Sequence, residues 1–173
     1  MAIGQILQSV PTPFFTETFD GYQAKLDAGF AVLGIRTEGE FLTSIAYLPQ
    51  HEAALPPQNR LAEEVCAQLG AYLVEPGFRF DLPIKLKGTP YQREVWRVIG
   101  GICCGATVSY QDIASRLYSA PRAVGQACGA NPVPIVIPCH RVVAKRGLGG
   151  FMHGRDEARL SIKRWLLAHE ARR

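Results

Sequence analysis

The first half of the chain contains two short apolar stretches followed by a longer amphipathic one. Residues 30–36 (FAVLGIR) and 41–49 (FLTSIAYLP) are rich in strand-forming residues, and the polar TEGE between them favours a β-hairpin. Residues 56–73 place apolar side chains at helical spacing, which predicts a helix beginning shortly after Pro57. The pattern therefore predicts a mixed α/β domain over residues 1–76. The expected buried positions of its helix are Leu61, Val65, Cys66, Leu69, Tyr72 and Leu73.

A stretch rich in proline and glycine separates this half from the next. Residues 75–90 (EPGFRFDLPIKLKGTP) contain three prolines and two glycines, and we interpret residues 77–88 as a linker. The sequence predicts a helix directly after this linker, because Thr89 can act as the N-cap, Pro90 suits the first helical position and Gln92 completes a capping box. Its expected apolar face consists of Val95, Trp96 and Ile99.

Residues 89–173 are predicted to be mostly helical, which makes the whole chain α+β. Ser109 and Asp112 have capping-box spacing at the start of one short helix, and Pro121 lies near the start of a second. Two short helices joined by a brief turn resemble a helix-turn-helix. A longer helix is predicted over residues 157–171. Its expected buried residues are Leu160, Ile162, Trp165 and Leu166.

The second short helix, RAVGQACGA at 122–130, consists almost entirely of small residues. A glycine inside a helix costs about 1 kcal/mol relative to alanine, so something should compensate. Close packing against the core and close approach of the helix backbone to a ligand both remain open. Arg122 lies in the first turn, where a cation opposes the helix dipole. That placement favours a contact between Arg122 and phosphate or bases.

Composition is that of a globular protein, and the charge distribution adds a partner class. The 173 residues are 47% apolar and 20% charged, with a net charge of +4. Residues 1–84 hold 4 Lys and Arg against 10 Asp and Glu, whereas residues 85–173 hold 15 against 5. A basic half of this size favours a polyanion, and nucleic acid before a membrane. A solvated basic surface without a partner is the alternative.

The stretch NPVPIVIPCHRVV, residues 131–143, contains the candidate nucleophile Cys139. A thiol attacks as the thiolate, so a reactive cysteine should have a lowered pKa. His140 and Arg141 follow directly, but adjacent side chains in extended backbone point to opposite sides, so His140 could act through water. A fixed nucleophile in a partly dry pocket and an inert core thiol are equally compatible with this local sequence.

Other cysteine and histidine chemistry has little support. Five cysteines without framework spacing indicate a reduced, intracellular setting rather than disulfides. The chain has no C-x-x-C or H-x-x-x-H spacing, so we expect neither a metal site nor a cofactor. No apolar run approaches the roughly 20 residues that span a bilayer, and residues 1–15 show no signal-peptide pattern. We therefore expect a cytoplasmic protein without a membrane partner.

NPVPIVIPCHRVV resembles the active-site signature of the O6-alkylguanine-DNA alkyltransferases. The stretches GTPYQREVW, VSYQDIA, RAVGQACGANP and KRWLLAHE are similar to further blocks of that family, in the same order. The resemblance is strong over residues 86–171 and loose before them. It implies an RNase H-like N-terminal domain followed by a helical domain with a winged-helix-like helix-turn-helix. It also implies irreversible, single-turnover transfer of an alkyl group from O6-alkylguanine, and from O4-alkylthymine, to the protein.

The same resemblance implies catalytic roles for individual residues. Cys139 corresponds to the alkyl acceptor. His140 would act on the sulfur through a bound water, with Glu170 holding its tautomer. Tyr110 would assist the departing guanine, and Asn131 would brace the helix-turn-helix against the active-site segment. Glu170 is unusual in its own right, since an anion is disfavoured at the end of a helix.

For DNA, the resemblance implies that the small helix enters the minor groove and that the target base is flipped into a pocket. The partner is then double-stranded DNA bearing O6-alkylguanine, bound by a monomer or cooperatively. The implied DNA-contacting residues are Arg122, Ala123, Gly125, Ala127, Tyr110 and Arg141. The implied pocket residues are Val142, Cys128, Gly149, Phe151 and Met152.

Residues 147–161 (GLGGFMHGRDEARLS) form a longer and more charged loop than is usual in that family. Two other classes of function remain alternatives. A cysteine hydrolase using Cys139 and His140 would turn over through an acyl intermediate and would leave the helix-turn-helix unexplained. A non-catalytic sensor of DNA lesions would share the scaffold but would not need the acceptor thiol.

Overall fold

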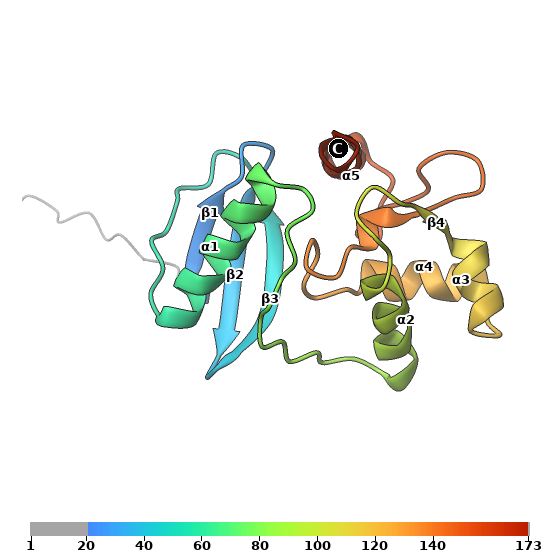
Figure 1. The fold of residues 1–173 in the computed structure, drawn as a ribbon, viewed down its shortest axis with the longest axis horizontal. Coiled ribbons are helices and arrows are strands. Elements are labelled where there is room, and N and C mark those ends of the chain that lie inside the picture. Colours follow the sequence, from blue (N-terminus) through green and yellow to red (C-terminus); the bar gives the residue numbers. More distant parts are fainter. Residues whose placement is uncertain (1–20, 173) are drawn as a thin grey trace, which may run out of the picture.

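The computed structural model describes residues 21–172, so the expectation about a signal peptide, which rests on residues 1–15, lies outside the described residues. Figure 1 shows a sheet covered by one helix and, beside it, a group of helices, joined by an extended segment. The elements are β1 (Ala24–Asp27), β2 (Val32–Glu38), β3 (Phe41–Leu48), α1 (Arg60–Val74), α2 (Pro90–Gly100), β4 (Val108–Ser109), α3 (Tyr110–Arg116), α4 (Pro121–Gly129), the 3-10 turn η1 (Cys139–Arg141), β5 (Val142–Val143) and α5 (Glu157–Glu170).

The sheet is a three-stranded antiparallel meander in the order β1-β2-β3, and the hairpin predicted around TEGE joins β2 to β3. Asn59 caps α1 by accepting a hydrogen bond from the Ala62 amide. The helix covers one face of the sheet (Figure 1) and packs Val65 and Leu69 into the core. Leu61, Cys66 and Leu73, also expected inside, are only partly buried.

The segment predicted as a linker lies against the sheet. The amide of Leu42 in β3 donates to the Pro83 carbonyl at 2.8 Å, and the amide of Lys85 donates to the Leu42 carbonyl at 3.0 Å. Ile84 thereby forms a parallel bridge with Leu42. Pro83 prevents a continuous strand because it lacks an amide donor, yet apolar residues on either side of it, such as Leu82 and Ile84, still pack partly buried against the core. The segment therefore extends the sheet by a short irregular edge.

The second half begins with two well-capped helices. Thr89 and Gln92 form the predicted capping box of α2, with Pro90 at its first position. Ser109 and Asp112 form the same arrangement at α3. The helices α3 and α4 follow one another across a short turn, and β4 pairs in parallel with β5. Both capping boxes were predicted from local spacing alone.

Helix α5 has the predicted extent but a different buried face. Leu166 is fully buried, whereas Leu160, Ile162 and Trp165 are only partly so. The Trp165 ring stacks on Phe30 of the N-terminal half, with ring centroids 4.1 Å apart, so α5 bridges the two halves. The remaining buried positions of α5 are polar: Lys163, His169 and Glu170.

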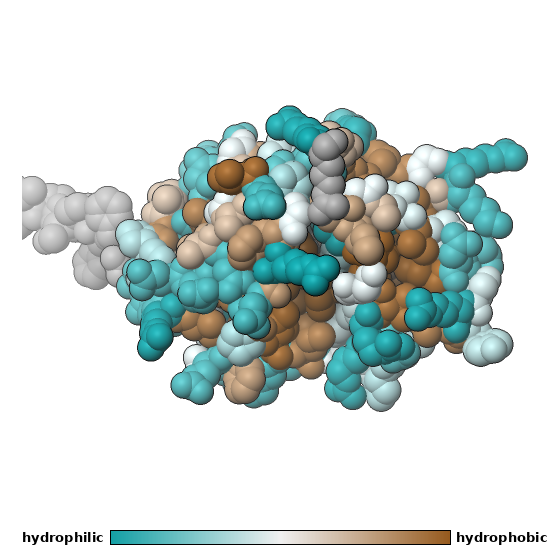
Figure 2. Space-filling model, viewed as in Figure 1, coloured by the Kyte–Doolittle hydropathy of each residue, from teal (hydrophilic) through white to brown (hydrophobic). Residues whose placement is uncertain are grey.

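The surface is mixed in character. In the view of Figure 2, hydrophilic side chains project from much of the molecule, with apolar residues visible between them. Within residues 21–172, no helix is long and apolar enough to cross a membrane.

Candidate active site

Cys139 opens η1, directly after the proline-rich segment, and is 4% exposed. The turn is tight, since the Ile137 amide donates to the Val133 carbonyl at 3.0 Å and the Cys139 amide donates to the Ile137 carbonyl at 2.8 Å. Extended backbone had been expected at Cys139 and His140. In a 3-10 turn, successive side chains instead project about 120° apart, so the two need not point to opposite sides.

The environment of Cys139 favours the protonated thiol over the thiolate. This corrects the expectation from the sequence that a reactive Cys139 has a lowered pKa. Burial raises the pKa of Cys139, and the nearby Asn131 amide and Lys163 charge offset only part of that rise. The resting sulfur therefore carries its proton. A reaction at this sulfur requires a base that removes the proton as the new bond forms.

His140, the next residue in η1, is a buried titratable group. Its side chain is fully buried, and its Nε2 lies 2.8 Å from Oε1 of Glu170. Burial lowers the pKa of His140, so the imidazole is neutral near pH 7. Because a carboxylate only accepts hydrogen bonds, Nε2 carries the proton and Nδ1 has a free lone pair. Nδ1 is buried and has no hydrogen-bond partner among the described residues.

Glu170 collects donors from several parts of the chain. Oε1 accepts from His140, from Arg141 Nη2 at 2.8 Å and from the Tyr72 hydroxyl at 2.9 Å. Oε2 accepts from Arg141 Nε at 2.9 Å and from the Gly105 amide at 3.3 Å. Burial alone would raise the pKa of Glu170, but the donors and charge of His140 and Arg141 outweigh it and hold that pKa well below its usual range. These partners account for an anion at the end of α5.

The position of Arg141 corrects what the family resemblance implied. Arg141 was expected on the DNA-contacting face, but its guanidinium bonds Glu170 and also the Ile102 carbonyl, and its side chain is only 11% exposed. A planar guanidinium fits a carboxylate in two-point fashion, and that geometry keeps Arg141 inside.

Asn131 and Tyr110 lie on either side of the thiol segment. Asn131 Nδ2 donates to the Ile137 carbonyl at 2.8 Å, and its Oδ1 accepts from the Val133 amide at 3.1 Å, so it ties the end of α4 to the segment before Cys139. The Tyr110 hydroxyl donates to the Gly150 carbonyl at 3.1 Å. Burial raises the pKa of Tyr110, so the phenol keeps its proton and remains a hydrogen-bond donor.

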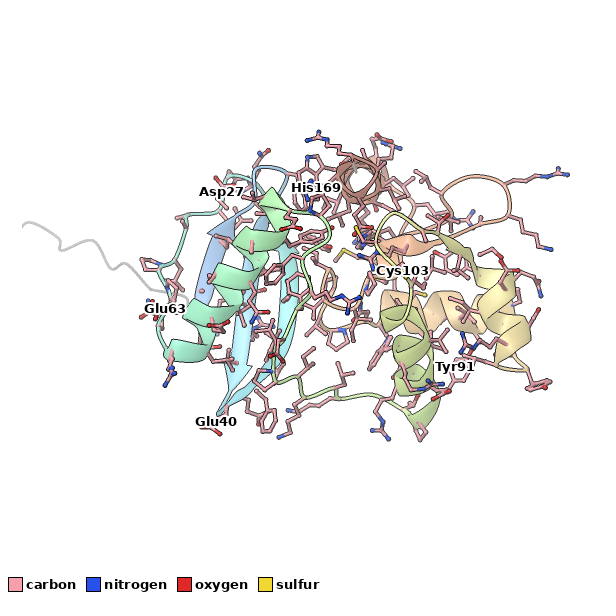
Figure 3. All side chains as sticks on the ribbon, in the orientation of Figure 1. Asp27, Glu40, Glu63, Tyr91, Cys103 and His169 are labelled. Atoms are coloured by element: carbon pink, nitrogen blue, oxygen red, sulfur yellow. The ribbon has the colours of Figure 1, made fainter. Side chains whose placement is uncertain are left out.

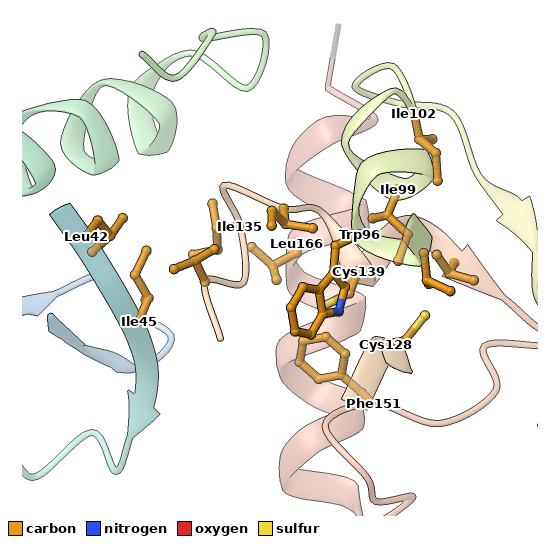
Figure 4. Packing of buried hydrophobic residues seen from close by; sticks show 14 of the residues in the cluster. Leu42, Ile45, Trp96, Ile99, Ile102, Cys128, Ile135, Cys139, Phe151 and Leu166 are labelled. Atoms are coloured by element: carbon orange, nitrogen blue, oxygen red, sulfur yellow. The ribbon is translucent and has the colours of Figure 1, made fainter. Parts of the chain in front are cut away.

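A cavity of about 530 Å³ opens beside Cys139. Cys128 and Phe151 lie near Cys139 alongside α5 (Figure 4) and belong to its wall. Burial raises the pKa of Cys128 to about 12, so this second thiol is inert beside the first. The predicted site residues that line the cavity are Cys139, Tyr110, Arg122, Gly125, Cys128, Gly149 and Phe151.

Several predicted contacts lie elsewhere. The Val142 side chain is fully buried, and Ala127 is 2% exposed with its carbonyl bound by Trp96 Nε1, so neither side chain faces the cavity or the surface. Helical periodicity explains Ala127, which lies on the core side of α4. Ala123 and Met152 are partly buried and are absent from the cavity wall.

Lys163 is the main residue that sequence reasoning missed. It is fully buried, and its Nζ donates to the carbonyls of Val142, Leu148 and Gly150 at 2.6, 2.7 and 3.0 Å. Burial lowers its pKa to about 8. Lys163 thus holds β5 and the 147–154 loop around the cavity. A signal was present, because Lys163 lies three residues from both Leu160 and Leu166, on the apolar stripe of the helix.

His153 also joins the cavity wall, and its position depends on a glycine. A Cβ at Gly129 of α4 would lie 2.5 Å from His153 Nδ1, so only glycine lets this ring pack on the helix. Met152 and His153 both have positive φ angles, 48° and 59°. The small residues of α4 are therefore used for close approach by the loop. Among residues 21–172, no cluster of His, Cys, Asp and Glu could hold a metal ion.

Comparison with known proteins is consistent across sequence and structure. A sequence model of the DNA-binding domain of 6-O-methylguanine DNA methyltransferase matches residues 90–172. A probable methylated-DNA–protein-cysteine methyltransferase of Acanthamoeba polyphaga mimivirus is 49% identical over 92 residues, which are 52% of this chain and 58% of the viral protein. The chain spans roughly half the length of the curated relatives it matches.

Solved structures match over most of the molecule. The O6-methylguanine methyltransferase of Mycobacterium tuberculosis is 31% identical, with a TM-score of 0.72, covering 85% of this chain and 90% of that one. Mycobacterium tuberculosis OGT in complex with DNA is 32% identical, with a TM-score of 0.70, covering 85% and 91%. The similarity therefore includes the N-terminal half, where sequence resemblance is weak.

Proposed function

The chain belongs to the O6-methylguanine DNA methyltransferase family, and from that premise we propose that it repairs DNA by moving an alkyl group from guanine O6 onto Cys139. Thymine O4 is a second expected donor. The observation that carries the proposal is a protonated thiol on the wall of a cavity of about 530 Å³, directly before a buried, neutral His140. Such a cavity is large enough for a flipped base.

The proposed reaction is a displacement at the alkyl carbon. His140 Nδ1 takes the Cys139 proton through one water, and the sulfur forms a bond to the carbon as the bond from carbon to O6 breaks. Guanine leaves with the electron pair on O6, accepts a hydrogen bond from the Tyr110 hydroxyl and takes its proton from solvent. Glu170 stays ionised and orients His140 without taking its proton. The thioether is inert to water, so each molecule reacts once.

We propose duplex DNA containing O6-alkylguanine as the partner, approached from the minor groove by α4. Arg122 lies at the mouth of the cavity, at the first turn of α4, where it could occupy the gap left by a flipped base. Ala123 and Gly125 offer a low profile for the approach. A monomer acting inside the cell is sufficient for this role.

The finer architecture belongs to the same proposal. We interpret residues 21–76 as the described part of a reduced RNase H-like domain, supported by the β1-β2-β3 meander, α1 and the parallel bridge between Leu42 and Ile84. Residues 77–88 connect it to a domain over 89–173, in which α3 and α4 form a helix-turn-helix of the winged-helix type.

The test is intact mass after incubation with duplex DNA containing one O6-methylguanine. We expect one methyl group per protein, on Cys139, and no further reaction. Cys139→Ser should abolish transfer while retaining DNA binding, and Cys66→Ser, in α1, should behave as wild type. Turnover beyond one equivalent, as a hydrolase would show, or modification at Cys103, Cys104 or Cys128, contradicts the proposal. A pure lesion sensor predicts binding with no mass change.

A further inference from the structure

One of the donors on Glu170 comes from the other half of the molecule. Tyr72, in the last turn of α1, is 1% exposed, and its hydroxyl donates to Glu170 Oε1 at 2.9 Å across 98 positions of sequence. The backbone of Tyr72 is held as well, because His169 Nε2 donates a hydrogen bond to the Tyr72 carbonyl at 2.9 Å. Figure 3 shows His169 where α5 meets the N-terminal half.

The aromatic ring of Tyr72 is held as firmly as its polar groups. It meets the His169 ring edge-on, with centroids 5.2 Å apart, and the Phe80 ring at 5.7 Å. Burial and the adjacent Glu170 carboxylate raise the pKa of Tyr72, so the hydroxyl keeps its proton and always donates. Tyr72 is thus a fixed neutral donor.

That donor shares its acceptor with the proposed base. Oε1 of Glu170 faces His140 Nε2 at 2.8 Å as well as the Tyr72 hydroxyl. Each donor withdraws electron density from the oxygen, so the hydroxyl weakens the attraction of Oε1 for a proton on the imidazole. The other charged and titratable groups near Tyr72 and His140 are Arg141 from η1, Lys163 and His169 from α5, Cys104 from the 101–107 loop and Tyr47 from β3.

We propose that Tyr72 is a positioning residue for the alkyl transfer, acting through Glu170 to keep His140 neutral and correctly oriented toward Cys139. The inference rests on the proposed function for its role in catalysis. It assigns the N-terminal half a direct part in the chemistry, through one hydroxyl, in addition to its part in the fold.

The variant Tyr72→Phe removes the hydroxyl and keeps the ring. Oε1 then becomes a stronger acceptor, which favours the protonated imidazole and raises the pKa of His140. Protonated His140 cannot accept the thiol proton, so the loss of rate is largest at low pH and fades as pH rises. We expect the acid limb of the transfer rate to move up by about half to one pH unit, which is ~3- to 10-fold in rate on that limb.

The experiment measures two quantities on the full chain. One is the His140 pKa from the ring nitrogen shifts of 15N-labelled histidine, and the other is the single-turnover transfer rate against pH. Tyr91→Phe is the matched control. It also removes a phenol hydroxyl, one that lies on α2, is hydrogen-bonded to Ser119 Oγ at 2.7 Å and is far from His169 (Figure 3). The control should leave the His140 pKa unchanged.

A second variant should shift the His140 pKa in the opposite direction. Replacing Tyr72 by 3-fluorotyrosine makes the phenol a stronger donor, so the His140 pKa should fall and the acid limb should move down. It also covers the case in which Tyr72→Phe does not fold.

A merely structural role for Tyr72 predicts an equal loss of rate at all pH values with an unmoved His140 pKa, and that result overturns the inference. Shifts of the same sign in the phenylalanine and fluorotyrosine proteins also overturn it. If no alkyl transfer occurs in any of the proteins while the His140 pKa moves as expected, the proposed function fails and the coupling from Tyr72 to His140 stands.

Discussion

Three ionisable side chains are buried around the thiol, and each has a different charge state. Lys163 is an ammonium held by three carbonyls, Glu170 is a carboxylate with five donor contacts, and His140 is neutral between them. Burial without partners would neutralise the two charged groups. The positions of donors and acceptors therefore decide which residue is free to accept a proton.

The buried ammonium of Lys163 should change how the free energy of unfolding depends on pH. Its pKa is about 8 in the folded protein against 10.5 ordinarily, so between these values the unfolded chain binds a proton that the folded chain does not. The free energy of unfolding should therefore gain a rising contribution from pH 8 to 10.5 and lose it as pH falls through this window.

The comparison is Lys163→Met, measured by urea unfolding at several pH values. The variant should lack this rising contribution and should be less stable at neutral pH by about 2 kcal/mol or more, because three carbonyls lose their donor. Parallel stability curves for the two proteins would contradict the lowered pKa of Lys163.

At this scale, sequence reasoning singled out residues whose signal was local. Cys139, His140 and Asn131 lie within one short motif, and Glu170 stood out by its position at a helix end. The contacts of Tyr72 and Arg141 with Glu170 were not predicted, because they cross 98 and 29 positions and depend on how α1, η1 and α5 pack together. No periodic pattern in the sequence indicates how these three elements pack together.

At the scale of elements, boundaries set by side-chain caps were predictable and boundaries set by tertiary contact were not. The boxes at Thr89 and Ser109 satisfy the first amides of α2 and α3 with residues three positions away. The composition of residues 75–90 predicted a linker over 77–88, but the pairing of Ile84 with Leu42 orders that segment. The sequence left two interpretations for the small residues of α4, and the packing of His153 on Gly129 supports close packing within the chain, whereas close approach to a ligand stays a prediction.

Helix α4 carries the prediction on base flipping. If Arg122 fills the space of an extruded base, Arg122→Ala should slow transfer on duplex DNA by about tenfold or more, since unstacking costs a few kcal/mol. Reaction with free O6-benzylguanine, if the cavity admits it, should change much less. Arg122→Lys should restore charge but only part of the duplex rate, because an ammonium cannot stack as a guanidinium does.

Single-turnover rates on duplex and on free base decide this prediction. Full rescue by lysine would make Arg122 an ordinary phosphate contact, and equal losses on both substrates would indicate damage at the cavity itself.

For the whole molecule, charge is divided between the halves. The acidic first half carries the sheet, and the basic second half carries α4 and the cavity. The halves are nonetheless continuous, since the Ile45 amide of β3 donates to the Pro132 carbonyl at 2.8 Å and Trp165 stacks on Phe30. The sequence predicted the two charge regions but not this shared core, which depends on contacts between distant segments.

DNA affinity should depend strongly on salt, falling about a hundredfold or more between about 50 and 200 mM, because bound phosphates release counterions. Arg155 lines the cavity, so Arg155→Gln should reduce the salt slope by about one charge. Lys87 pairs with Glu38 at 3.1 Å beside the sheet, and Lys87→Gln should leave the slope unchanged. Equal slopes for wild type and Arg155→Gln would exclude that cation from the DNA-binding face.

The hydrogen bond from Tyr72 to Glu170 also has a consequence for folding. It closes a loop of 98 positions, and contacts of such long range form after local helices, because the entropy of closure must be overcome first. A chain in the course of folding therefore has its capped helices before the Tyr72 hydroxyl is in place beside Glu170. During that interval Glu170 lacks the Tyr72 hydroxyl, so the set of hydrogen bonds around the His140–Glu170 pair is complete only when the two halves have docked.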